Sequence, residues 1–239
     1  MHGFSPNHFS SHQIGQIALY QPRIDQRFGH AGFLIPIIKG WCTETANELT
    51  SLGVQVHGGM GFIEETGAAQ YMRDARITAI YEGTTGIHGM DLIGRKMASE
   101  KAVTLKAVLG EIEGTIGQLA AAGAEFASIK AGLELSVKAA KEGAEYILAN
   151  FADNTKKSAA GSVPFLMLMG ITLGGWLLAK SALIAKAKLA AGDSDADFYT
   201  AKITTTRFFA EHIAPRTLAY AYEVVNGADS TLELADELF

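Results

Sequence analysis

The sequence contains few of the residues that build covalent or metal-centred sites. Its 239 residues include one cysteine, Cys42, which excludes an intrachain disulfide and a cysteine-based metal site. The seven histidines are scattered and none stands at a metal-ligand spacing such as H-E-x-x-H, so we expect no metal centre. Basic residues are outnumbered, with 20 Lys and Arg against 25 Asp and Glu. The resulting net charge of −5 argues against a nucleic-acid partner, because binding phosphates requires a basic face.

The sequence also lacks a recognisable targeting segment. Residues 1–32 have neither a charged amino-terminal region nor a small-residue cleavage site, so a signal peptide is not predicted and we expect a cytoplasmic protein. Glycines and prolines interrupt this segment, Pro22 among them, and therefore predict an irregular conformation. Hydrophobic residues make up 48% of the chain and charged residues 19%, which is typical of a globular protein with a generous core.

Apolar residues recur at helical spacing after residue 32. From Phe33 to Leu52 they predict an amphipathic helix, with Gly53 as its left-handed cap. A second helix is expected over about residues 66–76. Near its end, Arg73 and Asp74 form either an ordinary helix-end ion pair, which we favour, or a pair that positions the following loop.

Residues 99–239 are rich in Ala, Leu, Lys and Glu. Their apolar spacing and short breaks predict four helices near residues 108–119, 126–148, 156–191 and 197–225, the last one interrupted at Pro215. Four helices joined by short connections indicate an up-down bundle. We find no catalytic motif in this part of the chain, so we expect it to serve packing and oligomer contacts.

An uncharged segment, Ser158–Ala179, is long enough to span a bilayer. Four interruptions dilute its hydrophobicity: Pro164, Gly170, Gly174 and Gly175. A helix that is apolar on all sides can equally form the centre of a bundle. Since its neighbours are amphipathic, we expect protein rather than lipid to bury this segment, and we predict no membrane span.

Glycine is dense between Gly53 and Lys96, which is typical of loops that wrap a flat or phosphorylated ligand. Within this stretch, Glu82 follows two apolar residues and precedes a helix start at Thr84 or Thr85. A carboxylate between apolar neighbours loses hydration and becomes a better base. From the residues alone, Glu82 is either such a base or a solvated loop residue, and composition favours the solvated residue.

The order of motifs in this stretch resembles the C-terminal domain of the acyl-CoA dehydrogenases, flavoproteins that introduce a trans α,β double bond into acyl-CoA thioesters. The runs Q-V-H-G-G-M-G-F, R-D-A-R-I and I-Y-E-G-T-T-G-I follow one another within residues 33–97. The resemblance implies an all-α fold. The family's C-terminal helical bundle would occupy residues 33–98, after the irregular residues 1–32. A second up-down four-helix bundle would follow over residues 99–239, similar to the C-terminal extension of one branch of the family.

The resemblance also implies residue roles. Glu82 corresponds to the base that removes the α-proton while the β-hydrogen leaves as hydride to flavin N5, and Gly83 lines the acyl pocket. The segment that approaches the ADP half of an FAD held mainly by the neighbouring subunit corresponds to Gln55, Val56, His57, Gly58 and Gly59. A second FAD-contacting run corresponds to Thr84, Thr85 and Gly86.

The function implied is FAD-dependent dehydrogenation of an acyl-CoA substrate by a homodimer that passes its electrons to an electron-transfer acceptor. Two further domains precede this region in the family and supply most of the FAD and acyl-CoA pocket. We find no counterpart for them in the sequence, so we expect a C-terminal fragment of such an enzyme. The alternative is a non-catalytic helical oligomerisation or interaction module left after loss of the flavin-binding domains. The intact Y-E-G-T-T and Q-V-H-G-G runs favour the enzyme.

Overall fold

The computed structural model describes the backbone of residues 11–238 and the side chains of residues 30–235, 237 and 238. No strand occurs within residues 11–238, so the predicted all-α class is confirmed. The helices are α1 (Ser11–Val56), α2 (Gly59–Phe62), α3 (Ala68–Arg76), α4 (Thr85–Ile93), α5 (Val103–Ala122), α6 (Ala127–Phe151), α7 (Thr155–Ala160), α8 (Ser162–Ala190), α9 (Ala196–Phe208), α10 (Arg216–Asn226) and α11 (Ala228–Glu233).

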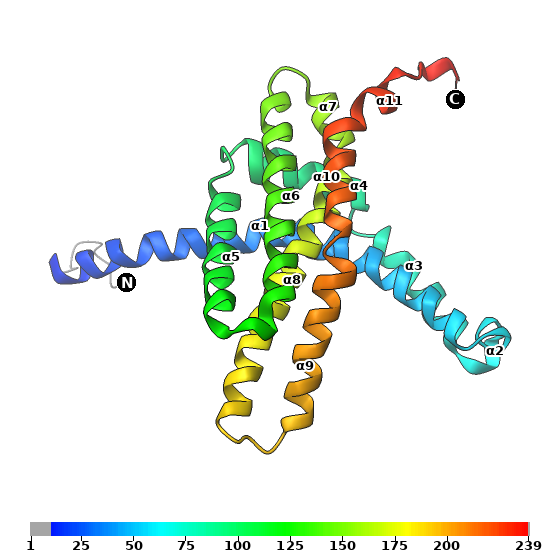
Figure 1. Cartoon of the computed structure of the whole chain (residues 1–239). Helices are drawn as coiled ribbons and strands as arrows, with labels where there is room; N and C mark the ends of the chain where they lie inside the picture. Colours follow the sequence, from blue (N-terminus) through cyan, green and yellow to red (C-terminus); the bar gives the residue numbers. More distant parts are fainter. Residues whose placement is uncertain (1–10, 239) are drawn as a thin grey trace, which may run out of the picture.

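The predicted four-helix bundle consists of α5, α6, α8 and the pair α9–α10, which run up and down across the long helix α1 (Figure 1). The last of the four is interrupted where expected. Pro215 has no N–H to donate, and a π turn, Phe209–Ile213, joins α9 to the segment before α10. In this turn the Ala214 N–H donates to the Phe209 carbonyl oxygen at 2.9 Å.

A single core joins both halves of the chain. Helix α8 packs against α6, α9 and α10 of the bundle and also against α1 and α4. Buried residues run without a break from Phe33 and Ile37 on α1, through Leu92 on α4, to Phe126 and Phe165 in the bundle. The two bundles expected from the sequence therefore share one core and are not separate packing units.

Helix α8 is the one helix in residues 11–238 that is long and apolar enough to cross a membrane by length and composition. Within the uncharged segment Ser158–Ala179, however, only Leu177 is exposed. Seven other α-helices contact α8: α1, α4, α5, α6, α7, α9 and α10. This packing supports the expectation that protein buries the segment, since the core helix of a bundle needs the same apolar composition.

Helix α1 begins earlier than the sequence pattern predicts. Its backbone is helical from Ser11, so the irregular conformation expected up to residue 32 is wrong for residues 11–32, while residues 1–10 lie outside the described part. Pro22 lies inside this helix. An interior proline costs about 3 kcal/mol and a glycine about 1 kcal/mol, which weakens a long helix without dividing it.

Glycines allow α1 and α8 to approach closely. A Cβ atom added to Gly170 of α8 would lie 2.1 Å from Cγ of Trp41 on α1. One added to Gly40 of α1 would lie 2.6 Å from a methyl carbon of Leu166 on α8. The crossing of these helices therefore requires glycine on both of them. This crossing also sets the position of the other side chains of α1 relative to the core.

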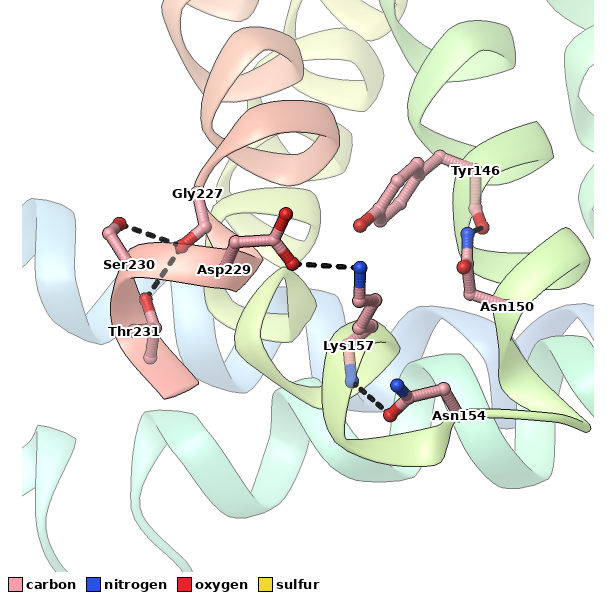
Figure 2. Close-up of polar contacts among 8 residues, drawn as sticks. All are labelled: Tyr146, Asn150, Asn154, Lys157, Gly227, Asp229, Ser230 and Thr231. Carbon is pink, nitrogen blue, oxygen red and sulfur yellow. Dashed lines mark hydrogen bonds and ion pairs between the residues drawn. The ribbon is translucent and has the colours of Figure 1, made fainter. Parts of the chain in front are cut away.

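Polar contacts tie the last helix to the bundle at one end (Figure 2). The side chain of Asn154 caps α7 by accepting a hydrogen bond from the Lys157 N–H at 3.3 Å. The Lys157 ammonium in turn lies 2.7 Å from a carboxylate oxygen of Asp229 on α11. This ion pair raises the pKa of Lys157, chiefly because the charged ammonium donates to Asp229.

We expect Asn154→Ala to lower the free energy of unfolding by about 1 kcal/mol, because the first turn of α7 loses its capping acceptor. Urea denaturation of the 239-residue chain measures this change. The matched control is Asn154→Asp, which keeps an acceptor oxygen and should leave the midpoint nearly unchanged. Equal losses in both variants would show that the cap is not the source of the effect.

Candidate functional site

Glu82 lies at the corner of a tight turn between the 3₁₀ turn Ile77–Ala79 and α4. Its φ of 55° places it in the left-handed region, and the next residue, Gly83, has a φ of 95°. A non-glycine residue in this region costs of order 1 kcal/mol and persists only where its surroundings hold it. Such backbone strain clusters at functional sites. The local sequence pattern does not predict the left-handed conformation of Glu82.

Side chains from two helices hold this turn. The Lys39 ammonium on α1 donates to the Gly83 carbonyl oxygen at 2.6 Å. The His88 Nε2 atom on α4 lies 3.3 Å from the Glu82 carbonyl oxygen. Both carbonyls of the strained unit are therefore engaged. Sequence analysis missed Lys39, because a contact 44 residues away leaves no local signal.

The carboxylate of Glu82 is available to solvent. Within the part of the chain whose side chains are described, no hydrogen bond or ion pair engages it, and the residue is exposed. Its predicted apolar neighbours are present, but Ile80 is 45% exposed and Tyr81 is 50% exposed. In this chain by itself Glu82 is therefore solvated, which is the alternative that composition favoured, and its apolar neighbours do not desolvate it.

The run Thr84, Thr85 and Gly86 forms the start of α4. Thr84 occupies the N-cap position as expected, yet its hydroxyl makes no capping hydrogen bond. The buried Thr85 hydroxyl points to α1 instead and donates to an oxygen of Glu44 at 2.5 Å. Gly86 faces open space, since the nearest atom to an added Cβ would be the Thr84 Oγ1 at 4.0 Å.

A pocket of about 480 Å³ opens beside this helix start. It is lined by residues of α1, of α3, of the turn and of α4, namely Glu44, Asn47, Arg76, Ala79, Ile80, Thr84, Thr85 and Gly86. The first N–H groups of a helix have no partner within the helix, and the helix dipole there favours negative charge. Together with Arg76, these groups favour an anionic portion of a ligand, whereas the Glu44 carboxylate, which accepts from Thr85 on the α1 side of the pocket, disfavours negative charge next to it.

The other predicted binding run lies at the far end of α1. Gln55 and Val56 belong to its last turn, so the helix continues past Gly53, and the left-handed residue is Gly58 with a φ of 61°. All five predicted residues of the run are exposed: Gln55, Val56, His57, Gly58 and Gly59. A Cβ added to either Gly58 or Gly59 would meet nothing within 4 Å. Their backbone is therefore open to a ligand.

The two predicted binding runs do not meet. Glu44, which contacts the second run, and Gln55, which begins the first, stand eleven positions apart on α1. At 1.5 Å per residue this separation is about 17 Å along the helix axis. Only an elongated ligand could contact both runs on this chain.

A second pocket, of about 520 Å³, adjoins the end of α1 and is lined mainly by apolar residues of α1, α2 and α3. At its edge the Arg73 guanidinium lies 2.7 Å from a Glu64 carboxylate oxygen. The predicted helix-end ion pair between Arg73 and Asp74 is therefore wrong, because Arg73 pairs with Glu64. Adjacent side chains on a helix point in different directions and do not face each other, whereas the turn before α3 brings Glu64 within reach.

Two family models match the chain. One, described as "Acyl-CoA dehydrogenase, C-terminal domain", matches residues 21–98. The other, described as "Acetyl-CoA dehydrogenase C-terminal like", matches residues 108–235.

Curated proteins resemble the chain over most of its length. It is 46% identical over 202 residues to a 3-methylmercaptopropionyl-CoA dehydrogenase of Ruegeria pomeroyi, covering 84% of this chain and 34% of that protein. It is 34% identical over 215 residues to a broad-specificity linear acyl-CoA dehydrogenase of Mycobacterium tuberculosis, covering 85% and 34%. It is 29% identical over 199 residues to a butyryl-CoA dehydrogenase of Syntrophomonas wolfei, covering 82% and 32%. The chain therefore spans about a third of the length of these relatives.

Proposed function

The chain belongs to the acyl-CoA dehydrogenase family, and on that premise we propose that it is the C-terminal part of an FAD-dependent enzyme in which Glu82 is the base. The reaction is α,β-dehydrogenation of an acyl-CoA thioester. The observation that carries the proposal is the strained backbone of Glu82, which presents a carboxylate without a partner in the described part of the chain. A general base needs such a free carboxylate within reach of the proton that it removes.

The main chain of the same turn supports this chemistry. The Glu82 N–H donates to no backbone carbonyl among the described residues, so it is free to donate to the thioester oxygen. A donor in this place stabilises the negative charge that develops on that oxygen as the α-proton leaves. Glu82 thus contributes both a general base, through its carboxylate, and a hydrogen-bond donor, through its N–H.

The open glycines and the start of α4 fit a dinucleotide cofactor. We assign the N–H groups at the start of α4, together with Arg76, to an anionic part of FAD. The exposed backbone at Gly58 and Gly59 would meet its other end. FAD, when bound, supplies the acceptor for the β-hydrogen as hydride, so this chain needs no redox group of its own.

The surface of residues 33–98 supports assembly with further protein. Large apolar side chains on α1, α3 and α4 are exposed: Ile35, Ile38, Leu49, Leu52, Val56, Tyr71, Met72, Ile87 and Met90. Exposed apolar surface of this extent marks a contact surface. We propose that the family's other domains and a second copy of the enzyme cover it, and that this covering desolvates Glu82. The alternative, a non-catalytic interaction module, accounts for the apolar surface but not for the strain at Glu82.

Flavin content tests the proposal. In a chimera, this chain replaces the matching third of the Ruegeria pomeroyi relative. We expect the chimera to purify yellow and its flavin absorbance to bleach when an acyl-CoA is added. The 239-residue chain alone should purify colourless, because the two binding runs leave a ligand open on most sides.

Two results would contradict this expectation. A chimera that holds flavin but is not reduced by short-, medium- or long-chain acyl-CoA would favour the non-catalytic module. A yellow 239-residue chain with near-stoichiometric flavin would place the whole cofactor site within this chain.

A further inference from the structure

We propose that Lys39 is a positioning residue that holds Glu82 in its left-handed conformation and so determines where the carboxylate points. The inference rests on the proposed role of Glu82 and adds a residue of α1 to the site. Its basis is the hydrogen bond of 2.6 Å from the Lys39 ammonium to the Gly83 carbonyl oxygen. No local motif contains both residues, which stand 44 positions apart.

Lys39 contacts the residues on both sides of Glu82. Beyond the bond to Gly83, its ammonium lies 5.9 Å from the centre of the Tyr81 ring, within the range of a cation–π contact. One cation thus restrains the residue before Glu82 and the residue after it. The Glu82 side chain stays free of this restraint, as a base must.

The hydrogen bond to Gly83 has no substitute among the described residues. No backbone N–H donates to the Gly83 carbonyl, because the first backbone bond of α4 goes to the Thr84 carbonyl instead. Removing the Lys39 donor therefore leaves a half-buried carbonyl unpaired. The strained turn would relax toward conformations that an L-residue prefers, and the carboxylate would move with it.

The position of Lys39 is itself fixed by the core. Its neighbours Ile37 and Gly40 are buried, and Gly40 packs directly against Leu166 of α8. The helix crossing of α1 and α8 therefore sets the point from which the lysine reaches the turn. Since other buried residues already hold α1 against α4 and α8, losing one ammonium should loosen the turn without unfolding the chain.

Hydrogen–deuterium exchange of the 239-residue chain tests the restraint. Lys39→Met keeps the apolar stem and removes the donor. We expect the hydrogen-bonded amides of the turn, those of Ile80 and Tyr81, which both donate to the Ile77 carbonyl oxygen, to exchange roughly fivefold faster in this variant, the effect of losing one ordinary hydrogen bond. Lys39→Arg should restore slow exchange, because it supplies a donor of similar reach. The matched control is Lys138→Met on the exposed face of α6, which should leave exchange at Ile80 and Tyr81 unchanged.

Turnover tests the consequence for the carboxylate. In the chimera described above, Lys39→Met should lower kcat by about 10- to 100-fold with flavin content and KM for acyl-CoA retained, since a small misplacement of a catalytic group has this effect. Lys39→Arg should recover most of the loss. A purely structural role would instead lower flavin content and thermal stability together with kcat.

Unchanged exchange at the amides of Ile80 and Tyr81 in Lys39→Met would overturn the proposal. So would faster exchange along the whole chain, which would make Lys39 a general stabilising residue. The exchange readout does not depend on the chemistry of Glu82. Normal turnover of a Glu82→Gln chimera would therefore refute the proposed function while leaving the restraint by Lys39 to be decided by the exchange data.

Discussion

Glu82→Gln should abolish most of the turnover of an enzyme that carries this chain. We expect kcat to fall by about 10²–10⁴-fold, the scale for a lone acid–base residue. Glutamine has the same size and can occupy the same exposed position in the turn. Flavin content and thermal unfolding should therefore stay at the level of the parent protein.

The measurement is the rate of flavin bleaching on mixing the chimera with an acyl-CoA, followed by steady-state kcat and KM. Glu142→Gln, at an exposed position of α6, is the matched control and should behave as the parent. Near-normal bleaching in Glu82→Gln would remove Glu82 from the mechanism. Lost flavin in the same variant would point to a role in cofactor binding.

Gly170→Ala should strongly destabilise the chain. The added methyl carbon would lie 2.1 Å from Cγ and 2.4 Å from Cβ of Trp41, so the ring and the backbone of α1 must both move. Overpacking a core in this way costs typically 1–3 kcal/mol, and we expect at least about 2 kcal/mol here, because the clash involves the Cβ atom as well as the ring. The loss should appear in urea denaturation of the 239-residue chain.

As a control, a Gly→Ala substitution on an exposed helix face should have the opposite effect on stability. A Cβ added to Gly114 of α5 would meet nothing within 4 Å. Gly114→Ala should therefore stabilise the chain by about 0.5–1 kcal/mol, since alanine loses less backbone freedom on folding. A Gly170→Ala variant as stable as the parent would mean that α1 and α8 do not cross at the distance described.

Local features of the site could be predicted from the sequence. The Y-E-G-T run identified Glu82, and the Q-V-H-G-G run identified the exposed glycines at the end of α1. Pro215 marked the interruption of the last helix, which the structure resolves with a π turn. These features depend on neighbours in the chain, because a missing N–H or a helical repeat acts over a few residues.

The sequence by itself therefore determined the all-α class, the four helices of the bundle and the family resemblance, which includes the position of Glu82. Tertiary structure alone decided what holds that residue: Lys39 reaches Gly83 across 44 positions and Glu44 reaches Thr85 across 41. The start of α1 and the partner of Arg73 likewise departed from the local pattern. The physical reason is that the glycine-mediated crossing of α1 and α8 fixes the position of α1 against the core. A contact of this kind depends on how whole helices pack, and no short stretch of sequence records it.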